Sequence, residues 1–106
     1  MGQKQIQQAL KIFTDRIKKK INPEQIILFG SYARGEANEF SDVDLIVISR
    51  KFAKIPEDKR FDILYDLTKG LYPDFHVYGF TKKELDSASP LTTLSQVKKY
   101  GIPLIS

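Results

Sequence analysis

Cysteine is absent from this sequence of 106 residues, and histidine occurs only once. The chain can therefore form no disulfide, no thiolate metal site and no cysteine nucleophile. Any bound metal has to be held by oxygen or imidazole ligands, which favours Mg²⁺ or Mn²⁺.

Long apolar runs are also missing, because no stretch approaches the roughly 20 apolar residues that span a bilayer. Residues 1–5 are not followed by the apolar segment of a secretion signal. Hydrophobic residues still make up 42% of the chain, with seven Phe and five Tyr, which is enough for one core. We expect residues 1–106 to form a single domain in the cytoplasm, without membrane contact.

An excess of positive charge, +4 in total, is the feature of the composition that would suit a nucleic-acid partner. The lysines at 18–20 end a helical pattern, where they are expected to complement the negative end of the helix dipole; the alternative is a phosphate-contacting patch. The sequence lacks the interleaved aromatic and basic residues of a nucleic-acid recognition surface. Charge alone does not support a nucleic-acid partner.

Apolar periodicity predicts alternating helices and strands. Helices are expected at residues 3–20, 31–36, 56–70 and 82–88, and from 90 until Gly101. Strands are expected at residues 25–29, 42–49 and 74–80, with a short edge strand at 102–105. Thr81 and Glu84 form a capping-box sequence at the start of the fourth helix. Strands separated by helices predict an α/β (α+β) domain, with a small mixed sheet flanked by helices.

A turn from strand to helix at Gly30 and Ser31 is the first candidate for chemistry. Glycine lets a ligand approach the backbone closely, and the first N–H groups of a helix point outward without an acceptor. These donors, the Ser31 hydroxyl and the Arg34 guanidinium would suit a triphosphate. The alternative is an ordinary strand-to-helix turn, with Ser31 as the N-cap.

A pair of acids, Asp42 and Asp44, opens the next predicted strand. Side chains alternate along a strand, so both acids face the same way, about 7 Å apart, while Val43 faces the core. Two neighbouring carboxylates repel each other, and a divalent cation removes that penalty. The alternative is a solvated turn, since Asx residues are common at the start of a strand.

The combination is more specific than either part. Gly30-Ser31, ten residues, and then Asp42-Val43-Asp44 resembles the signature of the polymerase-beta-like nucleotidyltransferase superfamily. The fuller strings Gly30-Ser-Tyr-Ala-Arg-Gly-Glu-Ala37 and Ser41-Asp-Val-Asp-Leu45 are similar to its minimal branch, the MNT domain proteins. The resemblance covers roughly residues 5–88 and is strongest over 28–48.

The resemblance implies a small mixed sheet and transfer of a nucleoside monophosphate, such as AMP, from an NTP such as ATP, with two Mg²⁺ or Mn²⁺ ions. By position, Gly30 and Ser31 would bind the β- and γ-phosphates, and Arg34 would be a weaker phosphate contact. Asp42 and Asp44 would hold the metal ions. Tyr32, between these motifs, could line the pocket or pack in the core, and we expect it to pack.

The family usually has a third carboxylate on the following strand, just before a Thr-X-X-Glu helix start. Asp74 and His76 both precede Thr81 here, and alternation puts them on the same face of the strand. Asp74 is our candidate for the third acid. His76 is the alternative, because an imidazole can ligate a metal or accept a proton near neutral pH. Glu84 is expected to serve as the capping partner and not as a ligand.

Members of the minimal branch are often paired with a small helical HEPN-domain protein, as antitoxins to its RNase activity, and some add AMP to a tyrosine of that partner. By resemblance, such a protein is the expected partner and acceptor. The alternative is a binding module that neutralises a partner by contact, without turnover. The uncertain third acid favours that alternative, and the intact pair of Asp42 and Asp44 speaks against it.

Overall fold

The computed structural model describes residues 6–38, 40–87, 97 and 99–105. Its elements are α1 (Gln7–Lys20), β1 (Gln25–Phe29), α2 (Gly30–Arg34), β2 (Val43–Ile48), the 3₁₀ helix η2 (Arg50–Lys54), α3 (Glu57–Asp66), β3 (Phe75–Phe80), α4 (Lys82–Asp86) and β4 (Ile102–Ile105). None of the helices in this part of the chain is long and apolar enough to cross a bilayer.

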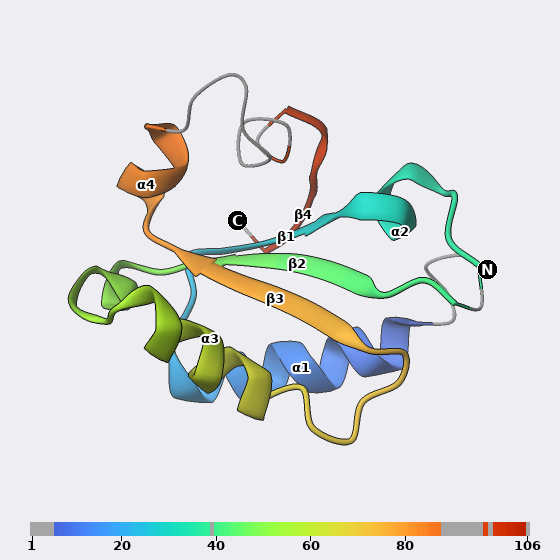
Figure 1. The fold of residues 1–106 in the computed structure, drawn as a ribbon, viewed down its shortest axis with the longest axis horizontal. Coiled ribbons are helices and arrows are strands. Elements are labelled where there is room, and N and C mark those ends of the chain that lie inside the picture. The colour runs from blue at the N-terminus through green and yellow to red at the C-terminus, as the bar shows by residue number, and fades with distance from the viewer. Residues whose placement is uncertain (1–5, 39, 88–96, 98, 106) are drawn as a thin grey trace.

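The strands form one mixed sheet in the order β3-β2-β1-β4. β1 runs antiparallel to both β2 and β4, whereas β2 and β3 are parallel and are connected through η2 and α3. Figure 1 shows α1 and α3 on one face of the sheet and α2 and α4 on the other. The predicted mixed sheet flanked by helices is confirmed.

The main core lies between the sheet and the layer of α1 and α3. Alternation in β2 sends Val43, Leu45 and Val47 to this side, where they pack with Phe13 of α1 and Leu64 of α3. All five side chains are fully buried. Burial of these residues fixes which face of β2 points inward, so the residues between them must face the other layer.

The opposite face of β2 changes character along its length. At its far end, Ile46 and Ile48 pack with Ile27 and with Leu85 of α4 in a second apolar cluster. At its near end, beside α2, the same face carries Asp44, and Asp42 precedes the strand. Along this face, the apolar residues Ile46 and Ile48 therefore give way to Asp44 at the end of the strand next to α2.

Several element boundaries differ from those that the sequence predicts; the third helix, for example, spans Glu57–Asp66 and not 56–70. The second helix occupies 30–34 and not 31–36, because Gly35 adopts a left-handed φ of 72° and ends it as a C-cap. The second strand is shorter, at 43–48. The predicted helix after Pro90 lies mostly outside the described residues, although Val97 and Tyr100 are helical, and residues 3–5 of the first helix also fall outside.

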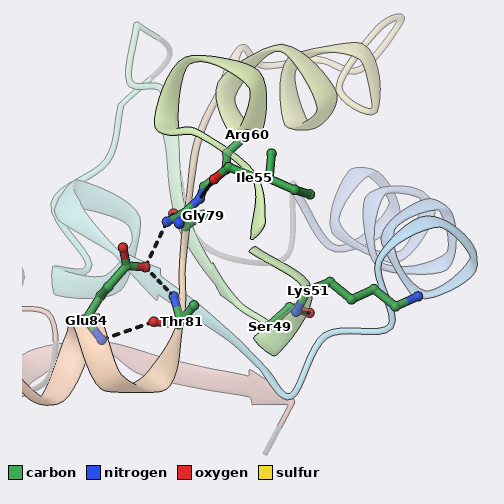
Figure 2. Close-up of polar contacts among 7 residues, drawn as sticks. All are labelled: Ser49, Lys51, Ile55, Arg60, Gly79, Thr81 and Glu84. Atoms are coloured by element: carbon green, nitrogen blue, oxygen red, sulfur yellow. Dashed lines mark hydrogen bonds and ion pairs between the residues drawn. The ribbon is translucent and has the colours of Figure 1, made fainter. Parts of the chain in front are cut away.

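The 3₁₀ helix η2 was not predicted from the sequence. It begins after Ser49, whose buried Oγ accepts a hydrogen bond from the N–H of Lys51 at 3.2 Å (Figure 2). Phe52 of η2 is completely buried in the main core. The chain therefore leaves the sheet through η2, and the buried ring of Phe52 holds η2 against the main core.

A buried cation joins η2, α3, β3 and α4 at the end of the sheet away from α2. Arg60 of α3 is only 6% exposed, and its Nη1 donates to Oε1 of Glu84 at 2.8 Å and to the Gly79 carbonyl at 3.2 Å (Figure 2). Its Nε donates to the Ile55 carbonyl at 2.7 Å, and its guanidinium lies 5.6 Å from the centre of the Phe52 ring. The buried guanidinium is thus hydrogen-bonded through both Nε and Nη1 and faces one carboxylate.

The capping box at the start of α4 is confirmed. The Thr81 hydroxyl accepts from the N–H of Glu84 at 3.2 Å, and Glu84 Oε1 accepts from the N–H of Thr81 at 2.7 Å (Figure 2). The same carboxylate also accepts a hydrogen bond from Arg60, so Glu84 has a structural role at this end of the sheet. It is not available as a ligand near Asp42 and Asp44.

Candidate functional site

The register of the sheet places Phe29 of β1, Asp44 of β2 and His76 of β3 side by side on neighbouring strands. Asp44 of β2 lies opposite Phe29 on one side and His76 on the other. Phe29 is the last residue of β1, so Gly30 and the start of α2 follow directly beside Asp44. Figure 1 shows α2 at the same end of the sheet as the start of β2. The glycine turn and the acid pair, ten residues apart in sequence, therefore lie together.

The backbone of Gly30 lies close to the side chain of Asp44. A Cβ atom built on Gly30 would collide with Asp44 Oδ2 and would lie 3.0 Å from its Cγ. Gly30 also has a φ of 74°, a conformation that residues with a side chain rarely adopt. Only glycine allows the backbone at the start of α2 to face this carboxylate directly.

His76 stands next to the acid pair. Its Nε2 lies 3.2 Å from Oδ2 of Asp42, and both side chains are about half exposed. A surface pair of this kind adds little to stability, so its groups remain available to a ligand. The contact depends on the parallel register of β2 and β3, which the sequence alone does not reveal.

The environment of Asp44 disfavours its charged form. Burial raises the pKa of the Asp44 carboxyl, and the neighbouring charge of Asp42 raises it further. His76 and Arg34 act in the opposite direction without cancelling the increase. A divalent cation bound beside Asp44 would favour the charged form of this carboxyl and so offset the effect of burial.

Asp74, our candidate for the third acid, occupies a different position from His76. Its backbone carbonyl accepts from the N–H of Val43 at 2.8 Å, while its side chain is exposed. It lines a hollow of about 400 Å³ between α3 and β3, which His76 also borders. Among the described residues, no group of three or more His, Asp or Glu side chains is arranged to hold a metal ion. The identity of the third position stays a prediction.

The predicted phosphate contacts lie on α2. Ser31 is half-buried, and its carbonyl accepts from the N–H of Glu36 at 2.9 Å. Arg34 is exposed and pairs with Glu36, with 3.0 Å between Nε and Oε2, although its charge is close enough to lower the pKa of Asp44. Tyr32 is 2% exposed, which confirms that it packs in the core.

Two aromatic side chains at the site were not singled out from the sequence. The rings of Phe29 and Tyr78 meet across β2, with 6.4 Å between their centroids. Phe29 is opposite Asp44, and Tyr78 lies two residues after His76 on the same face of β3. The period-two alternation of Asp74, His76 and Tyr78 could have identified Tyr78, because it places all three on one face.

Comparison with known proteins gives this geometry a context. The nucleotidyltransferase domain family matches residues 6–102. The protein adenylyltransferase MntA of Thermococcus cleftensis is 32% identical over 93 residues, which make up 88% of this chain and 90% of MntA. A candidate protein adenylyltransferase of Methanocaldococcus jannaschii is 44% identical over 69 residues, or 63% of this chain.

Solved structures agree with the sequence comparison. A toxin–antitoxin structure determined with AMP-PNP has a TM-score of 0.67 and 25% identity, covering 89% of this chain and 70% of the other. A candidate nucleotidyltransferase from Sulfolobus solfataricus has a TM-score of 0.71, covering 95% of this chain and 80% of the other. Its identity is 16%, so it supports the fold alone.

The matched chains differ in length. This chain spans 46%, 55% and 52% of three of the M. jannaschii relatives, whereas it spans 90% of the T. cleftensis protein.

Proposed function

This chain belongs to the nucleotidyltransferase domain family, and we propose that it transfers AMP from ATP, in the presence of Mg²⁺ or Mn²⁺, to a hydroxyl group of a partner protein. The observation that carries this proposal is the approach of Gly30 to Asp44. At Gly30 the backbone carries no side chain and lies beside the carboxylate of Asp44. Asp44 in turn pairs with His76 on the neighbouring strand. A phosphate group and a cation could be bound there side by side.

The triphosphate would lie against the start of α2. Gly30 has no side chain to exclude it, and Ser31 adds a hydroxyl donor. Arg34 would add a positive charge if its guanidinium left Glu36, an exchange that costs little because the pair is exposed. We assign the β- and γ-phosphates to Gly30 and Ser31, with Arg34 as an auxiliary contact.

The residues present fit a magnesium site completed by the substrate. Mg²⁺ is usually held by one or two carboxylates together with phosphate oxygens and water, and does not need a cage of three protein ligands. Asp42 and Asp44 supply two carboxylates beside the proposed phosphates, and a cation bound there would offset the burial that raises the pKa of Asp44. When bound, the metal would neutralise phosphate charge and polarise the phosphoryl group.

The proposed reaction is an in-line displacement at the α-phosphorus. The acceptor oxygen forms a bond to this phosphorus, the bond to the oxygen that bridges to the β-phosphate breaks, and pyrophosphate leaves. The proton of the acceptor hydroxyl has to pass to a base. We propose His76 for this position, because its Nε2 is 3.2 Å from Asp42. Asp74, which directly precedes β3, is the alternative.

The acceptor is proposed from the relatives. MntA of T. cleftensis is named a protein adenylyltransferase, and a solved neighbour is a toxin–antitoxin structure. We therefore propose a tyrosine hydroxyl of a small helical HEPN-type toxin as the acceptor, and the cytoplasm as the place of reaction. Modification or contact by this chain would silence that partner.

A second function, neutralisation by contact alone, has one observation in its favour. Within the described part of the chain, no three-ligand group of His, Asp or Glu is formed. A protein that lacked a working third position could bind the nucleotide and the partner without transferring AMP.

The experiment that tests the proposal uses ATP labelled at the α-phosphate, Mg²⁺ and a small helical HEPN-type protein as the partner. Transfer of this label to the partner, and no transfer from ATP labelled at the γ-phosphate, is the expected result. Asp42→Asn combined with Asp44→Asn should abolish it. A stable complex that never takes up the α-label would favour neutralisation by contact.

A further inference from the structure

An exposed tyrosine lies at the end of the sheet where the acid pair is found. Tyr72 belongs to the connection between α3 and β3, three residues before β3 begins, and its side chain is 75% exposed. Because β2 and β3 are parallel, the segment before β3 lies at the same end of the sheet as the segment before β2, which contains Asp42 (Figure 1). A phenol that is open to solvent is therefore present at the end of the sheet where we place the reaction.

The segment that carries Tyr72 is attached to the start of β2. The carbonyl of Asp74 accepts a hydrogen bond from the N–H of Val43 at 2.8 Å, and Phe75 pairs with Val43 in the register of the two strands. Pro73 and Phe75 are buried, whereas Tyr72 and Asp74 are exposed. The side chain of Tyr72 thus extends from a backbone segment whose position beside β2 is fixed by the fold.

The buried Tyr32 of α2 gives a second sign that Tyr72 and Asp42 are neighbours. Tyr32 is 2% exposed, and burial is the main reason why the pKa of its hydroxyl is raised. Tyr72 and Asp42 raise this pKa further, which requires both groups to lie near the Tyr32 hydroxyl. The two segments before β2 and β3 therefore place these side chains around one common neighbour.

The direction of the transfer reaction favours an acceptor on the β3 side of the acids. In an in-line displacement, the acceptor oxygen and the leaving pyrophosphate lie on opposite sides of the α-phosphorus. We place the β- and γ-phosphates at Gly30 and Ser31, which follow β1 on one side of β2. The acceptor then approaches from the other side of β2, where His76 lies on β3. Tyr72 precedes that strand.

The other four tyrosines of the chain lie elsewhere. Tyr32 is buried, and Tyr65 lies on α3, on the face of the sheet away from α2. Tyr78 is on β3, but its ring meets that of Phe29 at the end of β1, which is the side where we place the pyrophosphate. Tyr100 precedes β4, which β1 separates from β2. None of these four combines an exposed hydroxyl with the β3 side of the acid pair.

We propose that this chain also transfers AMP to itself, with the hydroxyl of Tyr72 as the acceptor within the same molecule. The inference rests on the proposed function, because it uses the same ATP and the same base. The Oη of Tyr72 forms a bond to the α-phosphorus, the bond from this phosphorus to the oxygen that bridges to the β-phosphate breaks, and pyrophosphate leaves. The phenolic proton passes to His76. The product is a phosphodiester that joins Tyr72 to adenosine.

The test incubates the full chain alone with Mg²⁺ and ATP labelled at the α-phosphate. The wild-type protein should become labelled, ATP labelled at the γ-phosphate should give no label, and mass spectrometry of its peptides should find one AMP group on Tyr72. Tyr72→Phe removes a single oxygen and should lose the label. Tyr65→Phe is the matched control, because Tyr65 is also more than half exposed, and this variant should keep the label. Both variants should unfold at the wild-type midpoint.

A mixing experiment tests whether the transfer stays within one molecule. Wild-type protein is incubated with a size-tagged copy that carries Asp42→Asn and Asp44→Asn and still contains Tyr72. Label should appear on the wild-type copy alone, and the labelled fraction at a given time should not depend on protein concentration. Label on the tagged copy would overturn the assignment to a single molecule.

The outcomes distinguish this inference from the function on which it rests. If the chain labels a HEPN-type partner but not itself, or labels itself at a residue other than Tyr72, the inference is overturned while the proposed function stands. If Tyr72 is labelled and the partner is not, the inference is supported and the proposed acceptor is wrong. If neither is labelled, both fail together.

Discussion

The backbone of Gly30 lies against the carboxylate of Asp44 so closely that no side chain fits between them. A Cβ on residue 30 would collide with Oδ2 of Asp44, and the left-handed φ of 74° already disfavours any other residue. This contact joins the end of β1 to the start of β2 across the sheet. It also creates the place where we put the phosphates and the cation.

Gly30→Ala should therefore abolish binding of Mg²⁺-ATP, because the added methyl group displaces the Asp44 carboxylate. Gly35→Ala and Gly70→Ala are matched controls. These glycines have φ values of 72° and 80°, and an added Cβ at either would meet no atom within 4 Å. Each control should cost about 1 kcal/mol of unfolding free energy through backbone strain and keep its ATP affinity. Equal ATP affinity in Gly30→Ala and Gly35→Ala, measured by calorimetry, would refute this role.

His76→Ala should lower AMP transfer by about a hundredfold or more, as expected for loss of a general base. Its effect on unfolding should stay within about 0.5 kcal/mol, because the contact with Asp42 is half-exposed. Asp74→Asn should keep most of the transfer. The backbone carbonyl of residue 74, which accepts a hydrogen bond from the N–H of Val43, is unchanged by this substitution. The α-labelled ATP assay compares the two variants. If Asp74→Asn loses transfer and His76→Ala keeps full activity, Asp74 and not His76 is the base.

Arg60→Met should destabilise the fold by about 3 kcal/mol. The variant leaves the carbonyls of Gly79 and Ile55 without their donor and removes the partner of Glu84. Arg50→Met is the control, because Arg50 is 88% exposed and its Nε lies 3.7 Å from the carboxylate of Glu24. Its cost should remain within about 0.5 kcal/mol. Urea unfolding measures both, and equal midpoints would show that the buried network contributes little.

Glu84 should make part of the stability dependent on pH. Burial alone would raise the pKa of Glu84, but hydrogen bonds from Arg60 and Thr81 outweigh burial and lower it below the ordinary value of 4.5. A carboxylate whose pKa is lower in the folded state stabilises the protein above the ordinary pKa. That contribution disappears as the pH falls from 4.5 through the lowered pKa.

The comparison that checks this prediction is urea unfolding of the wild-type protein and Glu84→Gln across the acidic range. The difference between their unfolding free energies should shrink as the pH falls below 4.5. In an Arg60→Met background the same substitution should change the pH dependence much less, because the largest of the lowering hydrogen bonds is gone. A difference that is constant with pH would contradict the lowered pKa.

The parts of this fold that follow from local periodicity could be predicted from the sequence. Alternation alone predicts that Asp44 faces away from Val43, and the complete burial of Val43 agrees with it. The capping box of Thr81 and Glu84 is likewise a local signal, since both partners lie within one turn of helix.

The remaining features depend on how distant segments meet. His76 contacts Asp42 only because β3 pairs with β2 in a particular register, which the crossover through α3 sets. Arg60 reads as a polar residue on the helix surface, and its burial follows from where α3 packs on β3. Tyr72 lies at the same end of the sheet as Asp42 only because β3 starts beside β2. None of these relationships leaves a periodic pattern in the sequence.

The most direct test of the account is calorimetric titration of ATP into the wild-type protein and into Asp42→Asn combined with Asp44→Asn. Asp58→Asn combined with Asp62→Asn makes the same chemical change at two exposed acids of α3 and serves as the control. We predict ATP binding that requires Mg²⁺, survives in the control and is lost in the Asp42 and Asp44 variant. Binding of equal strength in all three proteins, or in the absence of a divalent cation, would contradict the account.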